Sequence, residues 1–426
     1  MTITIHRGIN QIGGCITEIA SASGTKILID LGHNLPEGDS VAYDKYDNNA
    51  NLDELLDGVR AVFYTHPHGD HVGFEVQVAK RGIPQYIGET SKELMLLMKG
   101  HIAYTGNPQS LAEKEAFEKF HTFRAKETVK VDNTIRITPY FVSHSAPDAY
   151  MFVIECDKRR ILHTGDFRDH GYRGKGLIPT IETYITKKKT DVLITEGTML
   201  NRDDSRMMYE RELRDKAVKM VTGYKGVFVM CSSMDADRMA SFYQAATARG
   251  MMFVVDGYQW KVLEAIENSL GKKSTLYLFP KRRYFAKHTE EIRAAAKTKG
   301  FVMMVRNNYR IRNFINTIYP VLDPQQTLFI YSQFQGYILK GHPAFQQKTF
   351  EFVHSHDWQV EYLHTSGHAS REALTAVCTE VNPQLAIIPI HRDVKSDFYS
   401  LDIPQGLKDK VVTKTTTIED VEIIVK

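Results

Sequence analysis

The most informative stretch of the chain is Val59-Arg60-Ala61-Val62-Phe63-Tyr64-Thr65-His66-Pro67-His68-Gly69-Asp70-His71. Its first six residues form an apolar run that predicts a buried strand, and its last seven place three imidazoles and one carboxylate in a single loop. Two histidines at i and i+2 point the same way from a strand end, whereas the Asp-His pair that follows can turn toward a second point. Seven residues therefore hold enough donors to begin two metal positions.

The donor types in this loop indicate the kind of metal site. Neutral imidazole and carboxylate ligands suit Zn²⁺ or Mn²⁺. No cysteine stands beside these donors in the sequence, which argues against a purely structural zinc clip and favours an open, catalytic site. The alternative is a polar surface loop without a metal, but histidines rarely cluster this densely.

Three further candidate ligands stand where predicted strands end. His144 follows an alternating apolar run, Asp166 ends a short apolar run, and His391 follows the longest purely apolar run of the C-terminal part. Gly165 lets the backbone come close to other groups, and a carboxylate directly after it can bridge two cations. A lone histidine at a strand end is more often structural than a ligand, so this prediction depends on the three occurring together with the first loop.

These segments, in this order, resemble the metallo-β-lactamase fold in its nucleic-acid-processing branch, the β-CASP hydrolases, and within it the ribonuclease J family. The motifs that carry the likeness are His66-x-His68-x-Asp70-His71, His144-Ser145-Ala146-Pro147-Asp148, His163-Thr164-Gly165-Asp166-Phe167, Thr195-Glu196-Gly197, Ser366-Gly367-His368-Ala369 and Pro389-Ile390-His391. The resemblance implies an α/β fold, with a metallo-β-lactamase αββα sandwich and an inserted α/β (β-CASP) domain.

The resemblance also implies a ligand set for two divalent metal ions, with zinc favoured and manganese as the alternative. The ligands would be His66, His68 and His144 for one ion, and Asp70, His71 and His391 for the other, with Asp166 as a bridge. Asp30 matches the family's first motif, a carboxylate that orients a ligand or a loop. Its alternative role is that of an ordinary turn aspartate.

In addition to Asp70 and Asp166, the candidates for catalytic residues are His368 and Glu196. By resemblance, His368 is the general acid or a ligand of the scissile phosphate, and Glu196 polarises it. Glu196 could instead be a structural hydrogen-bond acceptor. Phosphodiester hydrolysis needs such an acid because the departing sugar oxygen must gain a proton while an activated hydroxide attacks in line.

Two serine-containing turns are candidates for holding a substrate phosphate. Ser232 and Ser233 lie between an apolar strand and a predicted helix, where backbone amides and hydroxyls suit an anion. The resemblance implies that this turn, together with Ser366 and His368, holds the phosphate at an RNA end between two domains. Serine is also a common helix cap, so capping is an equally good explanation for the pair.

The alternation of strands and helices predicts the domain organisation. Residues 1–200 form the first part of the metallo-β-lactamase domain, residues 201–345 form the inserted domain, and residues 346–426 complete the first domain. Regular βα alternation in the insert predicts a parallel sheet with strands at Gly226–Cys231, Met251–Asp256, Ser274–Phe279, Phe301–Arg306 and Thr327–Tyr331.

Composition agrees with an enzyme of two domains. The 426 residues are 42% hydrophobic, which is enough for large cores, and no apolar run approaches the roughly 20 residues needed to span a bilayer. The N-terminus lacks a charged segment followed by an apolar one, so we expect a cytoplasmic protein without a membrane partner. The four cysteines form no close pair in the sequence and are interpreted as buried free thiols.

Charge gives weaker evidence about a polyanionic partner, because the formal net charge is only +3. The runs Lys281–Phe285 and Arg306–Arg312 mix cations with aromatic residues, as a groove along a phosphate backbone does. A solvated turn or helix face explains such runs equally well.

These observations together predict a metal-dependent ribonuclease that hydrolyses RNA phosphodiester bonds with a two-metal-activated hydroxide and leaves 5′-phosphate and 3′-hydroxyl ends. The alternatives are a hydrolase of a small ester or thioester, a DNA-directed β-CASP nuclease and a non-catalytic RNA-binding scaffold. Endonuclease or exonuclease mode and the oligomeric state, including a homodimer, stay open at this point.

Overall fold

The computed structural model describes residues 1–36, 38–40, 43–104, 106–202 and 207–426. The chain divides into two compact units. Unit 1 comprises the described residues of 1–35, 42–206 and 367–426, and unit 2 those of 36–41 and 207–366. The α/β fold predicted from the sequence is confirmed.

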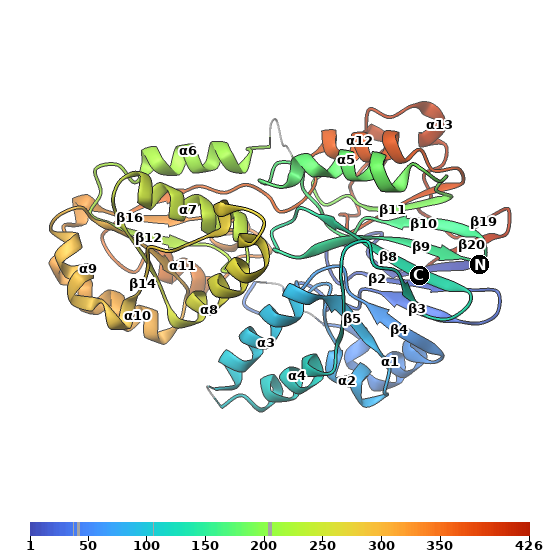
Figure 1. Ribbon diagram of the computed structural model, residues 1–426, viewed down its shortest axis with the longest axis horizontal. Helices are drawn as coiled ribbons and strands as arrows, with labels where there is room; N and C mark the ends of the chain where they lie inside the picture. The colour runs from blue at the N-terminus through green and yellow to red at the C-terminus, as the bar shows by residue number, and fades with distance from the viewer. Residues whose placement is uncertain (37, 41–42, 105, 203–206) are drawn as a thin grey trace. The chain divides into compact units, whose positions relative to one another are not determined.

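Unit 1 contains two sheets (Figure 1). Sheet 1 has the strand order β19-β20-β1-β2-β3-β4-β5-β6. Its strands are β1 Thr2–Arg7, β2 Ile16–Ala20, β3 Lys26–Ile29, β4 Val59–Phe63, β5 Gln85–Gly88, β6 His121–Phe123, β19 Thr416–Ile418 and β20 Val421–Val425. The antiparallel pairs β1–β2 and β2–β3 are followed by parallel pairing from β3 to β6, so β3 and β4 end on the same edge.

Sheet 2 has the strand order β18-β11-β10-β9-β8-β7. Its strands are β7 Val129–Lys130, β8 Ile135–Val142, β9 Ala149–Cys156, β10 Arg159–His163, β11 Val192–Glu196 and β18 Ala386–Ile390. Because β9 is antiparallel to both β8 and β10, while β10, β11 and β18 are parallel, four strands end on one edge of this sheet. Pro389 is tolerated in β18 because that strand lies at the end of the sheet, where a missing backbone donor costs least.

Apolar side chains fill both faces of sheet 2. One cluster, with Phe63 from sheet 1 and Phe152 from sheet 2 among its members, lies between the two sheets. A second cluster packs sheet 2 against α5 Leu177–Thr180 and α12 Arg371–Val381. The opposite side of the sandwich from α5, next to sheet 1, is covered by four helices (Figure 1). They are α1 Asn49–Leu56, α2 Glu75–Lys80, α3 Glu89–Ala103 and α4 Pro108–Glu118. Unit 1 is therefore an αββα sandwich.

Unit 2 is built on one parallel sheet, sheet 3, with the order β14-β13-β15-β12-β16-β17. Its strands are β12 Gly226–Met230, β13 Met252–Val255, β14 Arg282–Tyr284, β15 Phe301–Val305, β16 Thr327–Tyr331 and β17 Gln359–Tyr362. Its helices are α6 Glu210–Met220, α7 Ala236–Ala248, α8 Gly257–Ile266, α9 Thr289–Ala296, α10 Tyr309–Ile318 and α11 Gln347–Val353. The buried β12, β15 and β16 read as continuous apolar runs because helices cover a parallel sheet on both faces.

The structure of unit 2 differs from two of the predictions made from the sequence. The predicted strand Ser274–Phe279 is wrong: Thr275–Tyr277 is a turn of 3₁₀ helix, and the strand lies later, at β14. The Tyr277 hydroxyl donates to the Asp237 carboxylate at 2.6 Å, which holds that segment against α7. Residues 346–366, which the sequence analysis places in the C-terminal part of the first domain, lie in unit 2, because β17 adds to sheet 3 beside β16.

In the two runs that mix cations with aromatic residues, Arg282 and Arg306 form ion pairs with carboxylates of unit 2. Arg282 pairs with Glu267 at 2.7 Å, with its guanidinium 4.2 Å from the centre of the Trp260 ring. Arg306 pairs with Asp256 at 2.6 Å. These cations serve the fold of unit 2, so the runs are weaker evidence for a nucleic-acid groove than their composition indicates.

A buried ion pair fixes the chain near the candidate Ser366. The guanidinium of Arg238 on α7 donates to both oxygens of Glu210 on α6, at 2.9 and 3.3 Å, and to the carbonyl of Thr365 at 3.1 Å. Both charged side chains are almost completely buried, so each depends on the other for charge compensation. Among the described residues, no helix combines the length and the apolar character that crossing a bilayer requires.

Candidate metal centre

The ends of six strands of unit 1 carry the candidate site residues. Sheet 1 supplies Asp30 after β3 and the loop Thr65–His71 after β4. Sheet 2 supplies four others, which are His144 after β8, Asp166 after β10, Glu196 at the end of β11 and His391 after β18. Because strands of one sheet that run the same way end on the same edge, residues from 30 to 391 meet in one place.

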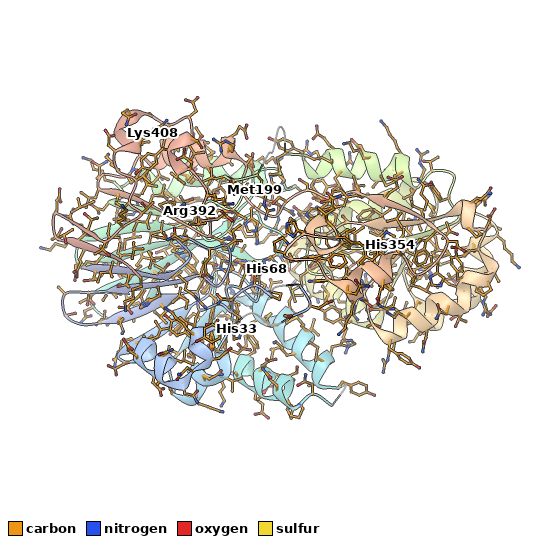
Figure 2. All side chains as sticks on the ribbon, turned by 180° about the vertical axis from the view of Figure 1, so that it is seen from behind. His33, His68, Met199, His354, Arg392 and Lys408 are labelled. Carbon is orange, nitrogen blue, oxygen red and sulfur yellow. The ribbon has the colours of Figure 1, made fainter. Side chains whose placement is uncertain are left out.

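The first cluster consists of three imidazoles. His66 Nε2 and His144 Nε2 each lie 3.1 Å from His68 Nδ1 (His68 is labelled in Figure 2). Four ligands around zinc at about 2.1 Å lie roughly 3.4 Å from one another, so the three nitrogens have the spacing of a shared metal. His66 and His144 are buried, and His68 is half-buried.

The other ring nitrogens of this cluster are held by hydrogen bonds. His144 Nδ1 donates to the Gly367 carbonyl at 2.6 Å. His66 Nδ1 lies 3.0 Å from the Thr65 hydroxyl, which itself donates to Asp30. These contacts place the proton on Nδ1 of both rings and leave Nε2 with a lone pair that faces the cluster.

The second cluster joins histidine and carboxylate. His391 Nε2 lies 3.1 Å from Asp70 Oδ2, and His71 Nε2 lies 3.8 Å from the same oxygen. His71 Nδ1 donates to Asp30 Oδ2 at 2.8 Å, and His391 Nδ1 lies 2.7 Å from the Thr198 hydroxyl. As in the first cluster, the Nδ1 contacts leave both Nε2 atoms directed to the centre.

Asp166 lies between the two clusters. Its Oδ2 is 3.1 Å from His71 Nε2 and 3.5 Å from His391 Nε2, and it is 3.9 Å from His66 Nε2 in the first cluster. Gly165 precedes it with φ +55°, and a Cβ at Gly165 would meet the Tyr150 carbonyl at 2.8 Å. Only glycine fits this turn, and the turn brings the carboxylate within reach of both clusters.

Asp30 supports ligands of both clusters. It accepts hydrogen bonds from the Thr65 amide at 2.7 Å and from His71, and through the Thr65 hydroxyl it also holds His66. Its φ is +58°, and that of His391 is +50°, a left-handed region that non-glycine residues seldom adopt. Strained backbone of this kind persists where the surrounding contacts over-determine it, as these do.

Burial and neighbouring charges shift the pKa values of the candidate ligands in different directions. Burial lowers the pKa of His68 to about 4, and it holds the pKa values of His66 and His144 well below the usual range. Burial also opposes ionisation of Asp70, but the neighbouring His71 and His391 outweigh it and keep the pKa of Asp70 below its usual range. The first cluster is therefore a set of neutral donors at neutral pH.

The second cluster behaves differently because it contains carboxylates. Burial alone would lower the pKa of His71, but Asp166, Asp30 and Asp70 raise it well above the usual range. His71 Nε2 is buried and lies 3.1 Å from Asp166 Oδ2 and 3.8 Å from Asp70 Oδ2. Three carboxylates around two imidazoles require positive charge, which a divalent cation supplies. The donor set, the spacing and this buried nitrogen all fit divalent metal ions.

His368 and Glu196 adjoin the second cluster. His368 Nδ1 lies 3.0 Å from Glu196 Oε2 and 3.6 Å from Asp166 Oδ2. Glu196 Oε1 accepts the backbone amides of Phe167 at 2.8 Å and Ala369 at 3.3 Å. Glu196 thus accepts two backbone amides and also contacts the imidazole of His368.

The serine candidates are placed in unit 2. Ser232 is exposed, and its hydroxyl accepts the Met234 amide at 3.3 Å. Ser233 is buried, and its hydroxyl accepts from the Gln259 side chain at 3.3 Å. The cap of α7 is Asp235, which accepts the Arg238 amide, so helix capping does not account for the serines. Ser366 is half-buried at the end of unit 2.

Sequence reasoning missed two residues beside the two clusters of candidate ligands. Thr198 follows β11 and holds both the ring and the carbonyl of His391. Cys15 lies next to His71 and His391, although it stands more than 50 residues from the nearer one in the chain. All four cysteines are buried and unbridged, as predicted. A thiol that reaches the site across a turn leaves no local spacing pattern to find.

Comparison with known proteins defines the class. Residues 17–214 match the family model described as the metallo-beta-lactamase superfamily. The chain therefore contains a metallo-β-lactamase domain, a fold for which bound divalent metal ions are characteristic.

Individual relatives refine this assignment. The chain is similar to Integrator complex subunit 11 of Gallus gallus, at 25% identity over 50% of this chain and 37% of that protein. It is similar to Ribonuclease J 2 of Streptococcus pyogenes, at 22% identity over 56% of this chain and 42% of that protein. Ribonuclease J 1 of the same organism matches 87% of this chain and 64% of its own length, at 21% identity. The resemblance to β-CASP nucleases is confirmed.

The chain spans less than half of the length of the first two relatives. A crystal structure of a protein of unknown function from Enterococcus faecalis V583 aligns with a TM-score of 0.66 at 19% identity and covers 92% of this chain and 94% of that one. This likeness shows that the fold of both units occurs together in another protein.

Proposed function

We propose that the protein is a metal-dependent ribonuclease that hydrolyses RNA phosphodiester bonds and leaves 5′-phosphate and 3′-hydroxyl ends. The observation that carries the proposal is the position of Asp166, whose Oδ2 lies within 3.9 Å of ligand atoms of both clusters and 3.6 Å from His368 Nδ1. The two-metal mechanism of phosphodiester hydrolysis needs two metal positions and a proton donor close together, and these contacts support such an arrangement.

The chain's own residues have separate roles in this reaction. His66, His68 and His144 would hold one divalent ion, and Asp70, His71 and His391 the other, with Asp166 shared. Bound metal ions would activate water for attack and neutralise charge on the phosphate. His368 would protonate the departing 3′ oxygen, and Glu196 would keep its ring oriented through the 3.0 Å contact to Nδ1. Asp30 and Thr198 would prevent the ligand rings from turning.

Zinc suits the proposed positions best, and manganese is the alternative. The first cluster offers imidazole nitrogens alone, a donor set for which Zn²⁺ is well suited. The carboxylates of the second cluster accept either ion. The ribonuclease names of the relatives favour RNA over DNA, or over a small ester, as the substrate class.

The function is tested with metal-loaded protein and a 5′-labelled RNA, a DNA of the same sequence and a small thioester. We expect cleavage of the RNA that depends on divalent ions. The products should have 5′-phosphate ends, which is tested by whether an RNA ligase can join them. Release of the label in mononucleotides would indicate exonuclease action from the 5′ end, and labelled oligonucleotides that end at internal sites would indicate endonuclease action. Hydrolysis of the thioester without cleavage of either polynucleotide would overturn the proposal.

The turn at Ser232 and Ser233, in which Ser232 is exposed and Ser233 is buried, leads to a prediction about the 5′ end of the substrate. Hydroxyls and amides at a strand-to-helix turn suit a terminal phosphate, so RNA with a 5′-monophosphate should be cleaved faster than the same RNA with a 5′-hydroxyl or a triphosphate. Replacing both serines with alanine should remove this preference and leave internal cleavage largely intact. Initial rates on the three RNAs measure the effect.

The control for this prediction is Ser269→Ala, which removes a hydroxyl elsewhere in unit 2 that contacts only the Ile266 carbonyl among the described residues. This variant should keep the native preference. Equal native rates on all three 5′ ends would show that the serines have no part in recognising the terminus.

A further inference from the structure

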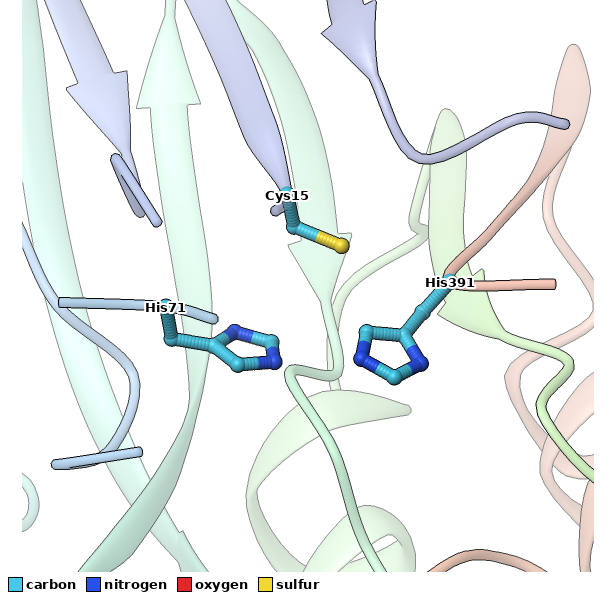
Figure 3. A group of neighbouring side chains, drawn as sticks. All are labelled: Cys15, His71 and His391. Atoms are coloured by element: carbon cyan, nitrogen blue, oxygen red, sulfur yellow. The ribbon is translucent and has the colours of Figure 1, made fainter. Parts of the chain in front are cut away.

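Cys15 lies at the second metal cluster. It directly precedes β2, and its side chain is 1% exposed. Its Sγ and one ring nitrogen each of His71 and His391 all lie within 4.8 Å of one another. Figure 3 shows the sulfur directed toward the space between the two imidazoles.

Backbone contacts tie Cys15 to the metal-binding loop. Its amide donates to the Asp70 carbonyl at 3.1 Å, and its carbonyl accepts the Gly32 amide at 3.3 Å. A Cβ at Gly32 would overlap the Asp70 backbone, so glycine allows these segments to pack together. The thiol is therefore held beside Asp70 by the same contacts that position the loop.

Gly8 leaves room for the thiol. A Cβ at Gly8 would lie 3.2 Å from Cys15 Sγ and 3.4 Å from the His391 amide, and its φ of +120° is one that other residues rarely adopt. A merely space-filling residue at position 15 could be any small apolar side chain. A thiol beside two imidazoles and a carboxylate has, in addition, the donor chemistry that zinc prefers.

We propose that Cys15 is an additional ligand of the metal position formed by Asp70, His71 and His391, and that it makes this position selective for thiophilic ions such as Zn²⁺ over Mn²⁺. This inference rests on the metal positions of the proposed function. On binding, a sulfur–metal bond forms as the thiol proton passes to solvent, with no change of oxidation state. The two positions then differ, one with imidazole donors and the other with nitrogen, oxygen and sulfur donors.

The selectivity has a physical basis in ligand softness. Thiolate binds soft and borderline ions such as Zn²⁺, Co²⁺ and Cd²⁺ in preference to hard Mn²⁺ and Mg²⁺. Imidazole and carboxylate without sulfur discriminate less between these ions. The sulfur would therefore decide the identity of one of the two ions, whereas the carboxylates alone would leave manganese as a competitor.

The test is cobalt substitution of the 426-residue protein. Co²⁺ bound by a thiolate gives a near-ultraviolet sulfur-to-metal charge-transfer band, separate from the visible bands that cobalt shows with any ligands. We expect this band in the native protein and in Cys378→Ser, whose cysteine is buried in the core of unit 1. We expect it to be lost in Cys15→Ser, with the visible bands retained.

Competition between Zn²⁺ and Mn²⁺ gives a second measurement. In Cys15→Ser, the preference for zinc at one position should fall by at least about tenfold, the lower end of what loss of a supporting group costs a metal site. The native spectrum is decisive even if Cys15→Ser fails to fold.

The outcomes separate the two proposals. Two bound cobalt ions without a charge-transfer band in the native protein, or a band that persists in a folded Cys15→Ser, would overturn the role of Cys15 and leave the metal positions intact. Failure to bind cobalt at either position would overturn the metal positions themselves.

Discussion

Asp166→Ala is expected to remove both metal ions, because one carboxylate oxygen faces the ligand atoms of both clusters. The loss in affinity should exceed the roughly 10–100-fold that changes to supporting groups cause, since Asp166 contacts the positions directly. Elemental analysis after dialysis against buffered zinc should fall from two ions per chain toward none, and RNA cleavage should be lost with them.

Variants that change a ligand of only one cluster distinguish a bridging carboxylate from a ligand of a single metal position. His144→Ala should lower the occupancy of the first position alone, and His391→Ala that of the second alone. Asp53→Ala, which removes an exposed carboxylate paired with Arg81, should leave the metal content unchanged. If Asp166→Ala retained one full equivalent of metal, the carboxylate would belong to a single position and not bridge two.

His368→Ala is expected to keep both metals and the fold and to lose about 10²- to 10⁴-fold in the rate of RNA cleavage, the usual contribution of a general acid. Its imidazole lies against Glu196 and adjoins Asp166 and His391, but the proposed ligand sets of the two metal positions do not include it. The fall should appear in kcat, measured with metal-saturated protein. Near-native turnover would remove His368 from the chemistry.

A substrate with a good leaving group distinguishes proton donation from binding. The nitrophenolate group of a nitrophenyl phosphodiester leaves without being protonated. The His368→Ala variant should therefore cleave this ester at close to the native rate. Equal losses on this ester and on RNA would assign His368 to phosphate binding instead. His121→Ala, which changes an exposed imidazole on β6, should behave like the native protein on both substrates.

The ligand candidates could be found in the sequence because each of them follows a strand. A strand that ends in a histidine or an aspartate leaves a local pattern, and the turn after β4 alone contains four donors. The structure brings these residues together across the two sheets of unit 1. Cys15 had no such pattern, since it reaches the cluster through hydrogen bonds between loops that are distant in the chain.

Other features depended on partners that the sequence does not identify. The cations Arg282 and Arg306 resembled part of an RNA groove, but Glu267 and Asp256 occupy them within unit 2. The segment Ser274–Phe279 has the composition of a strand, yet the hydrogen bond between Tyr277 and Asp237 holds it as a turn. Long-range contacts with side chains of other elements override local propensity in both cases.

The position of β18 in sheet 2 has a consequence for synthesis on the ribosome. β11 is complete once residue 196 has emerged, but the strand that covers its outer edge begins at Ala386. At about 5–20 residues per second, the roughly 190 residues between them take on the order of 10–40 s. During this time the nascent chain carries an uncovered apolar strand edge, a template for pairing with other chains. Residues 207–366 of unit 2 emerge in this interval, whereas unit 1 and the proposed metal centre must wait for His391.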